Sequence, residues 1–318
     1  MSAVLEALAL HPLRIPMRHR FRRVEHREVV LIEGPGGWGE FSPFPDYPAT
    51  VTARWLAAAL ELACAALPEP GRRFVEVNVT VPAVDPEVAA RIVIDSGAST
   101  AKVKVADPGD DEAADLARIE AVVQALGVGG RVRVDVNASW DLDTATSRLA
   151  NLVDFDLEYV EQPVATIEEM KELRRRVPIK LAADEMFRQS PDPLRVIEDG
   201  AADVVVMKVQ PMGGVSRLID LASRCPIPVV VSSALETSVG MYGGLLAGSL
   251  IDSPYAFGLG TVALLAGDPT TDPLVPSGGV LEVRRPTPDP ELLRRWRPDR
   301  DTSAALLRRV RAAAEVLA

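Results

Sequence analysis

The sequence predicts an α/β fold in which eight parallel strands alternate with helices and close into a barrel. Short, continuously apolar runs alternate with segments of helical periodicity over most of the chain, which is typical of a parallel sheet covered by helices. Several of these runs end on an ionisable residue, at the spacing of one strand, one helix and two loops. No strand-rich edge interrupts the alternation, so a closed barrel is favoured over a doubly wound open sheet, the second possibility.

A small unit of strands and one helix is expected before the barrel. Residues 3–16 and 26–33 alternate or run apolar and predict two strands, the second followed by a Gly-Pro-Gly-Gly turn. Residues 50–67 have helical periodicity, with Thr50 or Thr52 as the expected N-cap.

The barrel elements follow in strict alternation, and Asp85 and Asp141 are the clearest expected helix starts. A terminal amphipathic helix over residues 302–317 is expected to pack back on the N-terminal unit. The expected strands are 74–81, 100–105, 131–136, 157–161, 179–184, 204–209, 228–233 and 255–259. The expected helices are 85–96, 110–126, 141–153, 166–176, 191–199, 214–223 and 237–250.

Five ionisable residues close successive apolar strands. Lys104, Asp135, Glu161, Asp184 and Lys208 follow one another at steps of 31, 26, 23 and 24 residues. The carboxyl ends of parallel barrel strands point to one face, where active sites are built. These side chains are therefore expected to converge in space.

Lysine is rare in this chain and is found mainly at these strand ends. Only five of the 35 basic residues are lysines, and three of them, Lys102, Lys104 and Lys208, lie at or near the end of an apolar strand. Burying a charge there is costly. Because a lysine can give and take protons whereas arginine cannot, the sequence is predicted to keep lysine where proton transfer matters.

Three carboxylates at one barrel mouth predict a metal ion. Asp135, Glu161 and Asp184 would repel one another unless a cation lies among them. Oxygen donors without His or Cys suit Mg²⁺, with Mn²⁺ as a substitute. The alternative is that each acid pairs with an arginine or caps the following helix.

Composition and charge exclude several classes of protein. The formal net charge of −10 argues against nucleic-acid or anionic-membrane partners. The expected substrate is a small-molecule carboxylate, which the metal ion would hold. Cys64 and Cys225 make no disulfide framework and fit the cytoplasm, and no targeting segment is evident. All three histidines precede the predicted barrel, so a barrel histidine base and a Ser-His-Asp triad within the barrel are excluded.

The Lys-x-Lys, Asp, Glu, Asp, Lys order at successive strand ends resembles the enolase superfamily, specifically its muconate-lactonising subgroup, over essentially the whole chain. The resemblance implies a (β/α)7β barrel with an α+β capping domain built from both chain ends. The segments expected are residues 1–72 for the N-terminal part of the cap, 73–281 for the barrel and 282–318 for the segment that returns to the cap.

Two segments at the last two barrel strands narrow the range of possible reactions. Segments 231–240 (VSSALETSVG) and 257–261 (FGLGT) are similar to those of the o-succinylbenzoate synthases in that subgroup. This resemblance implies a hydro-lyase of menaquinone synthesis that dehydrates 2-succinyl-6-hydroxy-2,4-cyclohexadiene-1-carboxylate to 2-succinylbenzoate with Mg²⁺. Lys104 would remove the proton beside the carboxylate to form an enediolate, and would return it to the departing hydroxyl. Lys208 would face the ring as a cation, and Lys102 would favour neutral Lys104.

Four residues at the end of the seventh strand and just after it are the expected substrate contacts: Ser232, Ser233, Ser238 and Gly240. They would hold the succinyl carboxylate at a helix N-terminus. Alternatively, the serines only satisfy backbone groups at the strand end. Residues 17–22 are interpreted as a solvated basic turn or as a lid. Residues 212–214 are interpreted as a left-handed turn or as a phosphate nest.

Other functions remain open. An N-succinylamino-acid racemase or a dipeptide epimerase would use both lysines, although the Asp-x-Asp of dipeptide epimerases is absent from residues 257–261. Muconate cycloisomerase is a weaker match. A Schiff-base aldolase would use Lys208 as the nucleophile. A barrel kept only for binding would usually have lost one of the five strand-end residues.

Overall fold

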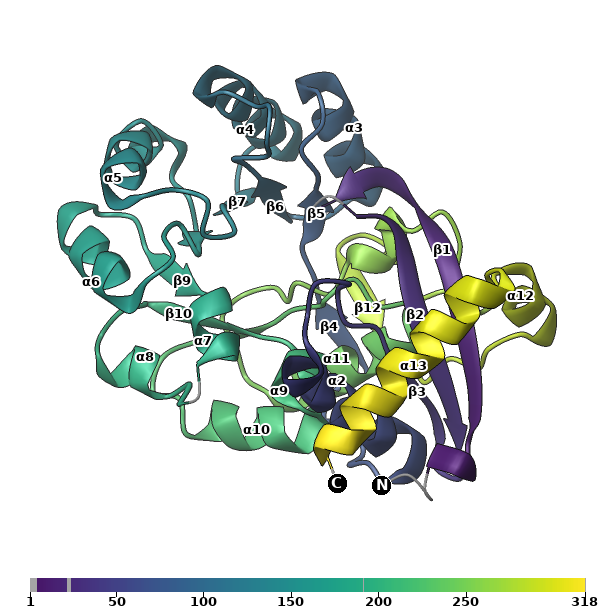
Figure 1. The fold of residues 1–318 in the computed structure, drawn as a ribbon. Coiled ribbons are helices and arrows are strands. Elements are labelled where there is room, and N and C mark those ends of the chain that lie inside the picture. Colours follow the sequence, from purple (N-terminus) through teal and green to yellow (C-terminus); the bar gives the residue numbers. More distant parts are fainter. Residues whose placement is uncertain (1–4, 22–23, 191, 318) are drawn as a thin grey trace.

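The computed structural model describes residues 5–21, 24–190 and 192–317. It has two parts that pack on each other (Figure 1). One is a ring of strands surrounded by helices, and the other is a cap made from the first and last segments of the chain.

Seven parallel strands form one sheet in the order β5-β6-β7-β8-β9-β10-β11, so each strand lies beside its neighbours in the sequence. A doubly wound sheet reverses its order at a switch point, and the described strands show no reversal. The barrel prediction is therefore confirmed. The strands are β5 Val79–Val81, β6 Thr100–Lys104, β7 Arg131–Asp135, β8 Tyr159–Glu161, β9 Leu181–Ala183, β10 Val204–Met207 and β11 Val229–Val231.

The eighth position of the ring is filled by a short stretch that is not a regular strand. Phe257 N donates to Glu76 O at 2.8 Å, and Gly258 N donates to Val231 O at 2.9 Å. These bonds connect the stretch to the segment before β5 on one side and to β11 on the other, and they close the barrel. The predicted strand over 255–259 reduces to isolated bridges.

The predicted first barrel strand is divided in two. β4 (Phe74–Glu76) pairs with β12 (Val280–Glu282), whereas β5 belongs to the barrel sheet. The backbone changes partners between them, because Val77 N donates to Gly279 O and Asn78 N donates to Phe257 O. The single strand predicted over 74–81 is therefore wrong in this detail.

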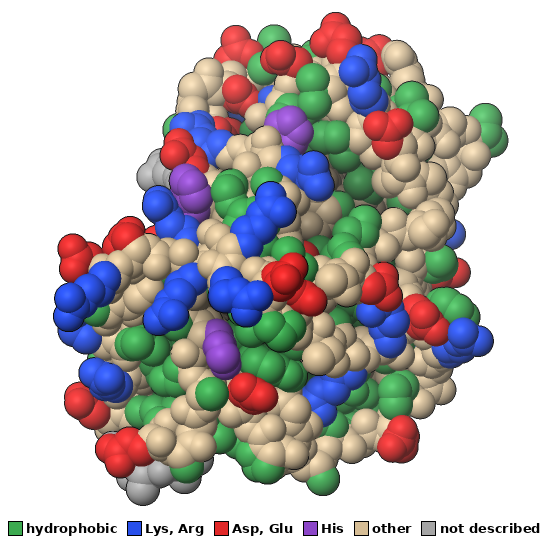
Figure 2. All heavy atoms as spheres, turned by 90° about the vertical axis from the view of Figure 1, so that its right-hand side faces the viewer, with side chains coloured by type: hydrophobic (Ala, Val, Ile, Leu, Met, Phe, Trp, Pro, Cys, Tyr) green, Lys and Arg blue, Asp and Glu red, His purple; other side chains and the backbone are tan. Residues whose placement is uncertain are grey.

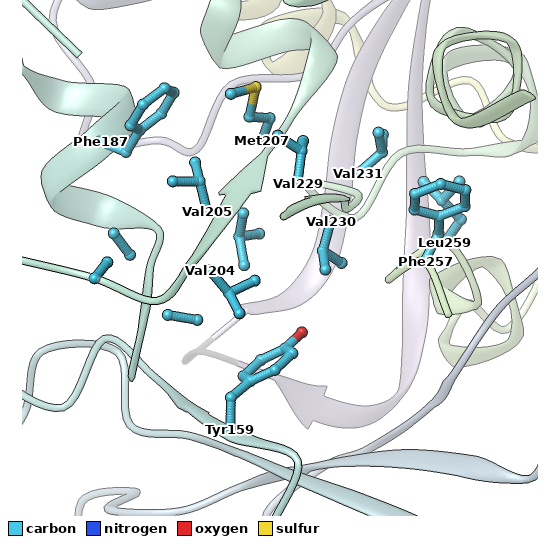
Figure 3. Packing of buried hydrophobic residues seen from close by; sticks show 14 of the residues in the cluster. Tyr159, Phe187, Val204, Val205, Met207, Val229, Val230, Val231, Phe257 and Leu259 are labelled. Carbon is cyan, nitrogen blue, oxygen red and sulfur yellow. The ribbon is translucent and has the colours of Figure 1, made fainter. Parts of the chain in front are cut away.

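The barrel strands are apolar because their side chains are covered on both sides. Figure 3 shows Val204 and Val205 of β10 near Val229 and Val230 of β11, and all four are at most 4% exposed. The core therefore extends along the strands below the strand-end charges.

Helices cover the outside of the ring, and the expected starts at Asp85 and Asp141 are confirmed as N-caps. The predicted helix over 191–199 is confirmed only in part, because among its described residues only those of α8 are helical, and a separate short helix, α7, ends before this range. The longer helices are α3 Pro86–Ser96, α4 Glu112–Leu126, α5 Leu142–Ala150, α6 Ile167–Arg176, α10 Val215–Ser223 and α11 Ser238–Leu250. The short ones are α7 Glu185–Gln189, α8 Arg195–Glu198 and α9 Val209–Met212.

The cap contains an antiparallel sheet, β1-β2-β3. Its strands are β1 Ala9–Phe21, β2 Val24–Gly34 and β3 Gly37–Phe41, and helix α2 spans Ala49–Cys64. The first strand therefore begins and ends later than the predicted 3–16, of which residues 3 and 4 lie outside the described part. The predicted threonine N-cap is also wrong, because Pro48 precedes the first turn and Thr52 Oγ1 bonds to Ala49 O.

The C-terminal helix returns to the cap, as predicted. α13 (Arg300–Leu317) lies along α2 and the cap sheet (Figure 1), and buried Leu306 and Val310 join Trp55 in one core. α12 (Pro290–Arg295) precedes it. In Figure 2, which views the molecule from this side, basic, acidic and histidine side chains are mixed on the surface. No helix in the described residues combines the length and apolarity needed to cross a bilayer.

Gly39 allows helix α2 to pack directly on β3. A Cβ added at Gly39 would lie 1.9 Å from Ala59 O. Gly39→Ala is therefore expected to lower the free energy of unfolding by about 1–3 kcal/mol, the usual cost of overpacking. Urea denaturation followed by circular dichroism measures the change, and a transition identical to wild type would contradict this close approach.

Candidate active site

The strand-end charges meet at one end of the barrel. Lys104 of β6 is in register with Asp135 of β7, which is in register with Glu161 of β8. Asp184 directly follows β9, and Lys208 directly follows β10. All five residues are at most 8% exposed. In-register parallel pairing therefore brings these charges together in a buried cluster.

Two lysines of β6 are paired with the first two carboxylates. Lys102 Nζ lies 2.8 Å from Glu161 Oε2 and 3.1 Å from Asp135 Oδ2. Lys104 Nζ contacts the same Asp135 oxygen and donates to Asn137 Oδ1 at 2.7 Å. Burial lowers the pKa of Lys102, but Glu161 and Asp135 raise it by more, so Lys102 stays protonated.

The third carboxylate is held from two sides. Lys208 Nζ lies 2.5 Å from Asp184 Oδ2, and Arg188 Nε donates to Asp184 Oδ1 at 3.0 Å. Arg188 also donates to Glu185 Oε1 at 2.9 Å and to the hydroxyl of Tyr47, a cap residue, at 3.0 Å. The cap is thereby tied to this side of the cluster.

Lys102, Lys104 and Lys208 line a common cavity. The cap contributes Phe21 and Phe44 to its wall. Lys104 Nζ lies 5.1 Å from the centroid of the Phe21 ring, a cation–π distance. The cavity therefore combines cations with apolar surface, as an anionic ring compound requires.

Asp135, Glu161 and Asp184 are the donors of the predicted Mg²⁺ site. Among the described residues, no three His, Cys, Asp or Glu side chains are arranged as ligands of one ion. Lysine or arginine nitrogens instead contact all three carboxylates. One carboxylate oxygen is available as a metal ligand, because buried Glu161 Oε1 has no hydrogen-bond partner. Burial raises the pKa of Glu161 to about 7, with a contribution from Asp135. Oxygen donors with this excess of negative charge fit a hard divalent cation.

Ser232 and Ser233 lie in the cavity wall. Ser232 Oγ donates to Gly258 O at 3.2 Å, and Ser233 Oγ lies 2.5 Å from Thr261 Oγ1, which also lines the cavity. The structure therefore brings these two predicted residues together with the lysines. Both hydroxyls also satisfy neighbouring groups, as the alternative interpretation expects.

Ser238 and Gly240 are separated from the cavity. Ser238 N donates to Asp268 Oδ2 at 2.9 Å, and Gly240 N donates to Glu40 Oε2 at 3.1 Å. Neither residue lines the cavity. The N-terminus of α11 is thus occupied by carboxylates of the chain itself, which explains why it does not present these N–H groups to a ligand.

Comparisons with known proteins decide the family. Residues 13–63 match the enolase N-terminal domain-like family, and residues 86–288 match the enolase C-terminal domain-like family. The o-succinylbenzoate synthase of Thermobifida fusca is 57% identical over 272 residues, 85% of this chain and 86% of that protein. The o-succinylbenzoate synthase of Mycolicibacterium smegmatis is 48% identical over 290 residues, 89% of this chain and 88% of that protein. The chain belongs to the o-succinylbenzoate synthase family.

Solved structures support the fold of this family member. A muconate lactonizing enzyme from Pseudomonas fluorescens superposes with a TM-score of 0.79 at 20% identity, over 92% of this chain and 98% of that chain. An N-succinyl Arg/Lys racemase from Bacillus cereus gives a TM-score of 0.77 at 20% identity, over 92% and 97%. Together with the two enolase domain-like matches, this similarity confirms the enolase-superfamily barrel with its cap.

Three polar residues beside the cluster were not predicted from the sequence. Asn137, which accepts from Lys104, follows Asp135 by two residues and has a left-handed φ of 51° that asparagine tolerates. Arg188 follows Asp184 by four residues, the spacing of neighbours on a helix. Both spacings are readable signals. The sequence around Tyr47 gives no such signal, because only the folded cap brings this residue to Arg188.

Two other segments have clear positions. In residues 17–22, Phe21 lines the cavity and Arg20 pairs with Asp107 at 3.0 Å, while Arg22 lies outside the described residues. At residues 212–214, two glycines have positive φ, and the Glu61 carboxylate accepts from Ser216 N at 3.0 Å and from Val215 N. Residues 212–214 therefore form a left-handed turn, and a carboxylate of the cap binds the N–H groups that follow it.

Glu40 of β3 is a fully buried carboxyl that accepts from Thr237 N at 3.2 Å. Burial raises its pKa from 4.5 to about 7, against the lowering effect of its hydrogen bond from Thr237. Because the folded-state pKa is the higher one, Glu40 favours folding below pH 4.5, and this contribution is lost as the pH rises through 7.

Glu40→Gln is therefore expected to reduce the loss of stability that wild type shows on going from about pH 5 to about pH 8, since glutamine does not titrate. Urea denaturation at several pH values measures the free energy of unfolding of both proteins. Equal pH dependence in the variant and wild type would contradict the raised pKa of Glu40.

Proposed function

We propose that this chain catalyses the dehydration of 2-succinyl-6-hydroxy-2,4-cyclohexadiene-1-carboxylate to 2-succinylbenzoate. The observation that carries the proposal is the cavity lined by Lys102, Lys104 and Lys208, with Asp135 among them. The product is the one in the name of the relatives that are up to 57% identical. The reaction breaks a carbon–oxygen bond and releases water, so the enzyme is a hydro-lyase.

Asp135, Glu161 and Asp184 are proposed to hold Mg²⁺, with Mn²⁺ as a substitute. When bound, the cation supplies a Lewis acid that balances the charge developing on the substrate carboxylate. The support is the oxygen-only donor set and the unpartnered Glu161 Oε1.

Lys104 is the proposed base and acid. Neutral Nζ would take the proton from the ring carbon that bears the carboxylate. The resulting ammonium would give that proton to the hydroxyl on the adjacent carbon, which leaves as water. The electron pair of the carbon–hydrogen bond ends in the ring, which becomes aromatic, so no oxidant or reductant is needed. Lys102 is held charged by Glu161 and Asp135 and disfavours a second positive charge on Lys104.

The other groups in the cavity have binding roles in this proposal. Lys208, which is paired with Asp184, would remain a fixed cation facing the ring. Ser232 and Ser233 would hold the succinyl carboxylate together with the nearby Thr261 hydroxyl. Ser238 and Gly240 are left out because their N–H groups donate to Asp268 and Glu40.

The biological setting follows from the reaction. We assign the enzyme to menaquinone synthesis in the cytoplasm. We also retain the division into a cap from residues 1–72 and 282–318 and a barrel from residues 73–281. The matched family segments, 13–63 and 86–288, are in keeping with a boundary between them.

Proton nuclear magnetic resonance tests the proposal directly. Purified protein with Mg²⁺ is expected to convert the cyclohexadiene into a compound with the aromatic signals of 2-succinylbenzoate. Absence of these signals, with folded protein and intact substrate, would contradict the proposed function.

Racemisation of N-succinylamino acids is the second candidate, because Lys104 and Lys208 both line the cavity and two bases are what a racemase uses. Incubation in deuterium oxide distinguishes it. Exchange at the α-carbon of an N-succinylamino acid without turnover of the cyclohexadiene would favour the racemase.

A further inference from the structure

A buried arginine from the cap holds part of the cavity wall from outside. Arg27 of β2 is 1% exposed. Its Nε donates to Leu235 O at 2.9 Å, and one Nη donates to Ala234 O at 3.3 Å and to Ser42 O. Ala234 and Leu235 line the cavity, whereas Arg27 does not. One cap side chain therefore fixes the backbone of two wall residues.

The backbone held by Arg27 has a conformation that needs support. Leu235 has a φ of 64°, in the left-handed region that a leucine adopts only at an energetic cost. On the other side of the loop, Glu236 Oε2 accepts from Ala234 N at 2.6 Å. The loop after β11 is thus held by a donor at its carbonyls and an acceptor at its N–H.

Arg27 also contacts the part of the cavity wall that comes from the cap. Its guanidinium carbon lies 4.8 Å from the centroid of the Phe44 ring, and Phe44 lines the cavity. The buried acids Glu40 and Glu236 interact with its charge and offset part of the cost of burying it. A planar group with several donors suits this task, and lysine cannot reproduce it.

We propose that Arg27 is a positioning residue for the substrate cavity. It joins the cap to the barrel at the wall itself and keeps Phe44, Ala234 and Leu235 in the arrangement that the substrate meets. The proposal rests on the proposed function only for the identity of that substrate.

Arg285 offers a matched control. Its guanidinium also donates to cap carbonyls, those of Gly36, Trp38 and Leu62, and it lies 5.4 Å from the centroid of the Tyr242 ring. None of these partners lines the cavity. A general loosening of the cap is therefore expected from either arginine, and a change in the cavity only from Arg27.

Steady-state kinetics of the Mg²⁺-loaded enzyme test the proposal with Arg27→Lys and Arg285→Lys. Arg27→Lys is expected to raise KM for the cyclohexadiene about tenfold and to change kcat less than about threefold, because it disturbs binding rather than proton transfer. Arg285→Lys is expected to leave both constants near wild type. Equal changes in KM for the two variants, or none for Arg27→Lys, would overturn the proposal.

Hydrogen exchange of the ligand-free proteins gives a reading that needs no turnover. Amides of residues 233–237 are expected to exchange about tenfold faster in Arg27→Lys than in wild type and to be unchanged in Arg285→Lys. Unchanged exchange in Arg27→Lys would overturn the role of Arg27. If wild type does not convert the cyclohexadiene, the proposed function fails, and exchange still decides whether Arg27 holds the wall.

Leu235→Ala covers the case in which Arg27→Lys does not fold. It removes the side chain that Arg27 positions and leaves the guanidinium in place. A rise in KM of about tenfold is expected. An unchanged KM would show that the part of the wall held by Arg27 does not contact the substrate, which would contradict the proposal.

Discussion

Lys104→Ala is expected to lower kcat/KM for the dehydration by about 10³- to 10⁴-fold, because one side chain both removes the proton and delivers it to the leaving hydroxyl. Lys102 keeps its contacts with Asp135 and Glu161 in this variant, so the fold and Mg²⁺ binding are expected to persist. Initial rates of substrate loss measure the effect, with circular dichroism and a calorimetric Mg²⁺ titration on the same sample.

Lys180→Ala is the control for loss of a lysine. Lys180 precedes β9, at the opposite end of the barrel, and donates to the Tyr255 hydroxyl at 3.3 Å. Its removal is expected to leave the rate unchanged. Turnover by folded Lys104→Ala at the wild-type rate would remove Lys104 as the base.

Asp184→Asn is expected to weaken Mg²⁺ binding by about 100-fold or more. The substitution keeps the shape of the side chain but removes one of three carboxylate charges at the proposed site. Lys208 and Arg188, which both contact Asp184, then add positive charge that this side chain no longer balances. Calorimetric titration with Mg²⁺ measures the affinity without relying on activity.

Asp203→Asn is the matched control, because Asp203 pairs with Arg174 at 2.6 Å near the start of β10, away from the cavity. Its Mg²⁺ affinity is expected to equal that of wild type. An unchanged affinity in Asp184→Asn would remove this residue from the proposed ligand set.

The barrel and its charged end were predictable from sequence because both depend on local patterns. Apolar runs define strands, and parallel strands in sequential order place their final residues at similar heights. Lys104, Asp135 and Glu161 consequently lie in register, and their position at the strand ends is sufficient to bring them together.

Other features depend on contacts between segments far apart in the chain. The division of residues 74–81 follows from pairing with β12, about 200 residues later. The N-terminus of α11 resembles an anion site in sequence, yet Glu40 and Asp268 already accept its N–H groups. Arg27 meets Leu235 only because the cap closes on the barrel. Periodicity and motif spacing do not contain such contacts.

The most direct test of the central claim is an ultraviolet assay of the purified protein with the cyclohexadiene substrate, first with Mg²⁺ and then with EDTA. The proposed mechanism predicts rapid loss of the diene absorbance, its arrest by EDTA and its recovery when excess Mg²⁺ is added. Absence of turnover under all three conditions, with folded protein and intact substrate, would contradict it.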